Sequence, residues 1–148
     1  MTDQPKSRAE VIAAIAALAS VAFATGASAG PPIWESYPHL NCRGEIVAMC
    51  SAETKACSAT SSKASFSINF EGHTVTYRTG DGEEVERIIA QNRLSDSGVV
   101  ISDAISLSSN RLIRFYPVAD GAAPIRALMV GTTFSFNADV TTLTCTAH

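Results

Sequence analysis

Residues 66–77 read FSINFEGHTVTY, and this stretch decides the fold class. Apolar side chains alternate with polar ones over residues 66–70 and again over residues 74–78, which is the period of a β-strand with one buried face. Glu71-Gly72-His73 lies between the two runs and forms a short connection that contains glycine. The stretch therefore predicts an antiparallel β-hairpin.

Short apolar runs separated by turn residues continue to the end of the chain. Further strands are expected at residues 85–90, 99–101 and 105–107 (either two strands or one bent strand), 110–116, 125–130, 133–136 and 140–145, with residues 91–96 as a connection. This pattern predicts an all-β fold, a single antiparallel β-barrel or β-sandwich of seven to nine short strands in mostly sequential order. The side chains expected to point inward are Phe66, Ile68, Phe70, Val75, Tyr77, Phe134, Phe136, Leu143 and Cys145.

Two stretches lack strand alternation. Residues 51–63 are rich in Ser, Ala and Thr and are expected to form a loop or to contain a helical turn. Residues 30–41 contain three prolines, which favour extended or turned backbone and disfavour a helix. We expect these residues to form an extended arm that precedes a β domain at residues 42–148.

The four cysteines, Cys42, Cys50, Cys57 and Cys145, can pair in three ways. The short separation of Cys50 and Cys57 favours a bond between them, and Cys42–Cys145 would then join the two ends of the β domain. Cys42–Cys50 with Cys57–Cys145 is the alternative. No C-x-x-C motif occurs and the histidines are not spaced as ligands, so neither a metal nor another cofactor is expected.

Residues 1–29 have the pattern of a cleaved signal peptide. Lys6 and Arg8 precede an apolar run at residues 11–24, and Ala27-Ser28-Ala29 supplies a site of small residues for a signal peptidase. The apolar run is short for a membrane span, which takes about 20 residues. We expect export to the periplasm or out of the cell, with no stable membrane span after cleavage. Paired cysteines are typical of such an oxidising compartment.

Charge and motifs exclude several classes of function. The net charge is −3 and no basic cluster occurs, so a nucleic-acid partner is not expected. No nucleophile elbow, P-loop, HExxH motif or EF-hand is present. His39, His73 and Asp103 could be combined with a serine, but nothing in the sequence orients them as a catalytic triad. The sequence favours a non-enzymatic protein over a small hydrolase.

Three residues are candidates for a binding surface. Trp34 and Tyr37 lie in the arm and could dock on a partner, although packing of Trp34 against its own domain is the favoured reading. Arg114 shares a strand face with Leu112 and Tyr116. An arginine on such a face is expected to pair with an acid or to lie at a sheet edge, and the functional alternative is an anion site inside a barrel.

Three short motifs carry a resemblance to a group of known proteins. LNCRG at residues 40–44, FSINF at 66–70 and TCT at 144–146 resemble small exported proteins of Gram-negative, alphaproteobacterial-like bacteria. The resemblance implies a single exported β domain with a cysteine near each end, and it transfers no functional residue.

The leading hypothesis is a non-enzymatic binding module that recognises an envelope protein or a small ligand. Envelope inhibitors of lysozymes or proteases use similar small β domains, which is an analogy of fold alone. A structural or self-assembling envelope component is the alternative, and a small hydrolase is a further one.

Overall fold

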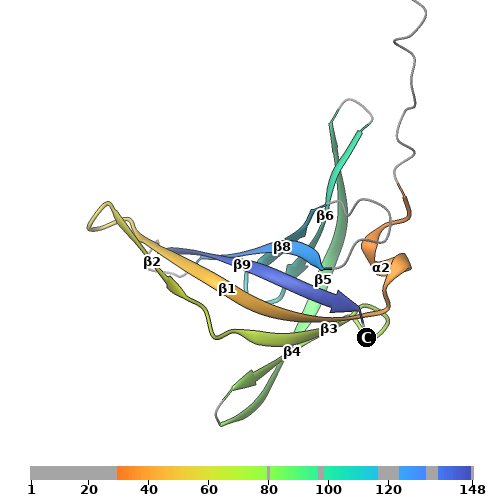
Figure 1. The fold of residues 1–148 in the computed structure, drawn as a ribbon, viewed down its shortest axis with the longest axis horizontal. Coiled ribbons are helices and arrows are strands. Elements are labelled where there is room, and N and C mark those ends of the chain that lie inside the picture. The colour runs from red at the N-terminus through yellow and green to blue at the C-terminus, as the bar shows by residue number, and fades with distance from the viewer. Residues whose placement is uncertain (1–29, 80, 97–98, 117–123, 133–136, 148) are drawn as a thin grey trace, which may run out of the picture.

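The computed structural model describes residues 30–79, 81–96, 99–116, 124–132 and 137–147. Antiparallel strands dominate this part of the chain and confirm the all-β class (Figure 1). The elements in chain order are α2 (Ile33–Ser36), β1 (His39–Ser51), β2 (Ala56–Ser61), β3 (Ser65–Asn69), β4 (Thr74–Thr79), β5 (Gly82–Asp96), β6 (Val99–Leu107), β7 (Leu112–Phe115), β8 (Ile125–Thr132) and β9 (Ala138–Ala147).

The sheet closes into a barrel. Its strands follow the order β1-β3-β4-β5-β6-β7-β8-β9, and β9 pairs in turn with β1. The result is an eight-stranded antiparallel barrel with β2 as one extra strand. The sequential order predicted from the short connections is confirmed, and the architecture is a barrel rather than a sandwich. Closure also removes the exposed edges of these eight strands, whereas β2 pairs only with β1.

The two halves of β1 have different partners on one side. Residues 39–43 pair with β3, whereas residues 46–51 pair with β2, and β9 lies along the other side of both halves. The register shifts between Gly44 and Val47, which marks a β-bulge. A Cβ atom at Gly44 would collide with the Ser62 side chain. Glycine therefore permits the close approach of the two chain segments at this bulge.

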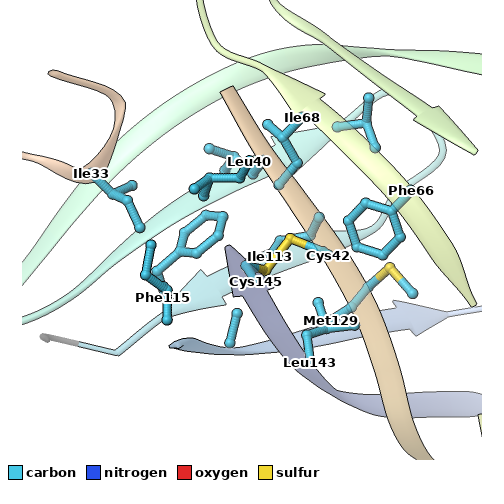
Figure 2. Packing of buried hydrophobic residues seen from close by; sticks show 14 of the residues in the cluster. Ile33, Leu40, Cys42, Phe66, Ile68, Ile113, Phe115, Met129, Leu143 and Cys145 are labelled. Carbon is cyan, nitrogen blue, oxygen red and sulfur yellow. A yellow bond between two sulfur atoms is a disulfide. The ribbon is translucent and has the colours of Figure 1, made fainter. Parts of the chain in front are cut away.

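The barrel encloses the apolar core that strand alternation predicts (Figure 2). Tyr77 is half-buried and packs against this core. Phe134 and Phe136, together with the strand expected at residues 133–136, lie outside the described residues. The other residues expected to point inward are buried, namely Phe66, Ile68, Phe70, Val75, Leu143 and Cys145.

Both favoured disulfides are present. Cys42–Cys145 joins β1 to β9 across a sequence separation of 103 residues, and Cys50–Cys57 joins β1 to β2 across a separation of 7. Both bonds link residues that lie directly opposite each other in neighbouring strands. Two structural disulfides indicate that the protein folds in an oxidising, extracytoplasmic compartment.

Two expected interruptions of the strand pattern are wrong. The connection expected at residues 91–96 belongs to β5, which pairs there with β6. The loop expected at residues 51–63 contains β2, although every residue of β2 is exposed. Alternation signals a strand only where one face is buried. In β2 the backbone pairing with β1 maintains the strand without a buried face.

The prediction of a helix-free arm is also wrong, because α2 forms a single turn within it. Pro32 occupies the N-cap position, and its carbonyl oxygen accepts hydrogen bonds from the backbone N–H groups of Glu35 and Ser36. A proline at the start of a helix removes no internal hydrogen bond, because the first N–H groups lack partners in any case. Pro38 follows the helix, where it does not interrupt it.

The two disulfides should differ in their effect on stability. Replacing Cys42 and Cys145 with serine should lower the free energy of unfolding by about 4–5 kcal/mol, because this bond closes a long loop. The matched replacement of Cys50 and Cys57 should cost about 2–2.5 kcal/mol on the same chain-entropy argument. Urea unfolding followed by circular dichroism measures both values. Equal losses in the two variants would contradict the view that Cys42–Cys145 secures the closed barrel.

Candidate functional site

Apolar side chains of the described strands form a buried core inside the barrel. Figure 2 shows the Cys42–Cys145 disulfide beside Ile113, with further buried side chains around it. The rings of Phe70 and Phe115 meet edge to face, with their centroids 6.1 Å apart.

One end of the barrel is covered by α2, and we call it the helix end (Figure 1). Ile33 is buried in the core, and Trp34 and Tyr37 are half-buried against it. The backbone N–H of Ile33 donates a hydrogen bond of 2.8 Å to Asp103 Oδ2. Arg93 Nε lies 3.4 Å from Asp103 Oδ1. Two of the three candidate binding residues thus pack against their own domain and cover this end.

The third candidate, Arg114, lies on the outer surface of the barrel. Its neighbours Ile113 and Phe115 are buried inside, so alternation along β7 turns Arg114 outward. Arg114 Nε donates a 2.8 Å hydrogen bond to the buried hydroxyl of Ser102, and its guanidinium lies 5.7 Å from the centroid of the Tyr116 ring. Arg114 therefore does not lie inside the barrel, where the anion site was expected. Among the described residues, a hydroxyl group of the neighbouring strand β6 accepts its hydrogen bond. The expectation of an acidic partner stays a prediction.

The other end of the barrel carries a polar cluster of Tyr77, Glu86, Ser109 and Arg111. Glu86 is 6 % exposed and accepts hydrogen bonds from Arg111 Nη1 at 3.0 Å and from Ser109 Oγ at 2.8 Å. The Arg111 guanidinium lies 5.5 Å from the centroid of the Tyr77 ring. Burial, assisted by the negative charge of Glu86, raises the pKa of Tyr77 from 10.0 to about 12. Tyr77 is therefore protonated at neutral pH.

The sequence analysis did not predict this cluster, although the position of Glu86 in its strand indicates it. Glu86 lies two residues before Ile88 on the same strand, so it shares the inward face with a buried residue. A buried carboxylate is costly unless it is paired and hydrogen-bonded. An acid on an inward face therefore predicts a basic partner nearby, and Arg111 takes that role.

Beyond this end of the barrel extends a hairpin of β1 and β2, residues 46–61, which we call the tip hairpin (Figure 1). Cys50–Cys57 links its strands just before the turn at residues 52–55. Ile46 and Met49 are 52 % and 56 % exposed. A hollow of about 320 Å³ lies on the hairpin, lined by Met49, Cys50, Ser51, Thr54, Ala56, Cys57, Ser58 and Asn137.

Within the part of the chain that the structure describes, Asp103 is not joined to a histidine, as a catalytic triad would require. Asp103, the acid considered for a triad, is bonded to the backbone of Ile33 and paired with Arg93 rather than with a histidine. His39 and His73 are both exposed. No group of three or more His, Cys, Asp or Glu side chains within the described ranges could hold a metal ion.

Comparison with protein-family models, curated proteins and solved structures finds no match to this chain. Among residues 30–147, so far as the structure describes them, no helix is long and apolar enough to cross a membrane.

The pKa of Tyr77 predicts a specific loss of stability at alkaline pH. In the unfolded chain Tyr77 should lose its proton near its ordinary pKa of 10.0, whereas in the folded protein it keeps the proton up to about pH 12. The unfolded state thus binds fewer protons between these values, so stability falls as pH rises through this window. Tyr77→Phe should show a shallower fall in thermal midpoint between pH 10 and pH 12 than the unchanged protein. Parallel curves would contradict the assignment.

Proposed function

We propose that this chain is an exported, non-enzymatic binding module that recognises a protein in the cell envelope through the tip hairpin. The observation that carries the proposal is the exposure of this hairpin. β2 is exposed along its whole length, yet a disulfide fixes it to β1. A strand that buries nothing in its own domain contributes little to the core, so its surface is available to another molecule.

The disulfide makes the tip hairpin suitable for binding. A flexible loop must be ordered on association, and that ordering subtracts from affinity. Cys50–Cys57 fixes the two strands in advance, so less freedom is lost when a partner binds. Ile46 and Met49 offer exposed apolar surface, and unbranched methionine adapts readily to a partner's shape. Inhibitor-like binding of an envelope enzyme is one form that this recognition could take.

A protein partner is favoured over a small ligand. The packing of Phe70, Phe115 and the Cys42–Cys145 disulfide inside the barrel argues against ligand carriage there. The hollow at the tip hairpin lies on a projecting element, where a protein surface can reach it.

The proposal includes a cleaved signal peptide at residues 1–29 and a location in the periplasm or outside the cell. The two disulfides support the oxidising compartment. The resemblance to exported proteins of Gram-negative bacteria remains a prediction from short motifs.

A second candidate function, self-assembly in the envelope, is favoured by one feature of the outer surface. Leu112, Val130, Val140, Ala48 and Ala59 lie directly opposite one another on five neighbouring strands. Residues opposite each other point to the same face, so they form an uncharged row on the outside of the barrel. Analytical ultracentrifugation that finds a monomer at every concentration would remove this candidate.

The proposed function can be tested by capture from a periplasmic extract. The exported protein, purified after expression of the full chain, is immobilised beside its Met49→Asp variant. Because Met49 lies on the tip hairpin, this variant should retain about tenfold less of the partner, the effect of a charge placed in an apolar contact. Quantitative mass spectrometry of the retained proteins gives the ratio.

Val85→Asp is the matched control, because Val85 is 60 % exposed on β5, away from the tip hairpin. It should retain the partner as the unchanged protein does. Failure to retain any protein reproducibly, or equal loss in both variants, would count against the proposal.

A further inference from the structure

β2 is the one strand described here that pairs on a single side. Its partner is β1, and the strand stands at the end of the sheet order because β3 leaves with β4 to form the barrel wall. An edge strand presents unpaired backbone N–H and C=O groups to its surroundings. Such an edge is a template on which an extended segment of another chain can pair.

The register shows which backbone groups face outward. Cys50 and Cys57 lie opposite each other with Cα atoms 4.0 Å apart, the short spacing of a pair that exchanges no hydrogen bonds. At the other end of the hairpin, the Ser62 N–H donates a hydrogen bond of 3.0 Å to the Glu45 C=O, so the backbone of Ser62 faces β1. Backbone groups alternate in direction along a strand, so Thr60 and Ser58 face β1 as well. The residues whose N–H and C=O groups point away from β1 are therefore Cys57, Ala59 and Ser61.

The edge lacks the features that protect exposed edges in other proteins. Those features are charged side chains, proline and bulges within the strand. β2 reads ACSATS and contains no charge and no proline. Charges stand only outside it, where Lys55 precedes the strand and Lys63 follows it. Both lysines are exposed, and within the described residues neither is in an ion pair.

This charge pattern disfavours a second copy of the chain as the occupant. Two copies of β2 can pair antiparallel over their whole length in one symmetric register, with Ala59 opposite Ala59. That register brings Lys55 of one copy toward Lys63 of the other just beyond the two ends of the paired strands, where like charges repel. A strand with acidic residues at its two ends would instead place a carboxylate beside each lysine.

We propose that the free edge of β2 adds an extended strand of the partner protein, uncharged in its middle and acidic at both ends. The added strand exchanges hydrogen bonds with Cys57, Ala59 and Ser61, and Lys55 and Lys63 fix its position along the edge. This inference rests on the proposed function and specifies how the tip hairpin recognises its partner.

The test uses a display library of random twelve-residue peptides selected on the exported full-chain protein. Enriched sequences should carry Asp or Glu at both ends of about seven uncharged residues, the number of positions between Lys55 and Lys63. Ala59→Pro removes an outward N–H without breaking a bond to β1, and it should weaken binding of the best peptide about tenfold. The double variant Lys55→Glu, Lys63→Glu should weaken it to a similar extent at low salt.

Arg87→Glu is the matched control for charge reversal, because Arg87 is exposed on β5 and does not flank β2. It should bind the peptide within about twofold of the unchanged protein, since an exposed charge far from the site is screened. Selection of no peptide, of peptides without acidic ends, or of peptides that bind Ala59→Pro undiminished would overturn the inference. If a partner is lost by Met49→Asp but retained by Ala59→Pro, strand addition is wrong and the proposed function stands.

Discussion

β9 pairs with β1 along most of its length, and the Cys42–Cys145 disulfide joins the two strands within that pairing. The remaining architecture depends on this closure. Because β9 occupies one side of β1, β2 and β3 share the opposite side. β3 takes only the first half of β1 before the barrel wall turns away with β4. The second half of β1 continues past the barrel and has β2 as its partner, so closure itself produces the projecting hairpin.

The two ends of the barrel are held by different interactions. At the helix end, Ile33 enters the core and its backbone is bonded to Asp103, a carboxylate that also pairs with Arg93. At the other end, Arg111 and Ser109 satisfy the buried carboxylate of Glu86. These contacts stabilise the two ends of the domain. The proposed recognition surface lies elsewhere, on the tip hairpin, which is fixed in shape by Cys50–Cys57 and has an unpaired edge.

Much of this fold could be predicted from the sequence, because alternation reports burial. Phe66, Ile68 and Phe70 marked a strand with one inward face, and the spacing of the cysteines favoured the correct pairing. α2 and β2 could not be found in this way, since one is a single turn begun by proline and the other buries no face. The candidate site was missed for the same reason. Trp34 and Tyr37 are conspicuous aromatic residues but pack on their own domain, whereas the available surface is a plain run of Ala, Ser and Thr.

The account holds that β2 is paired on one side and free on the other. Amide hydrogen exchange of the unbound protein, followed residue by residue by NMR, tests this most directly. Slow exchange is expected at Ser58 and Thr60, whose N–H groups bond to β1, and fast exchange at Cys57, Ala59 and Ser61. Protection of all five amides would show that the edge is already covered, and fast exchange at all five would show that the hairpin does not persist. Either result would contradict the account.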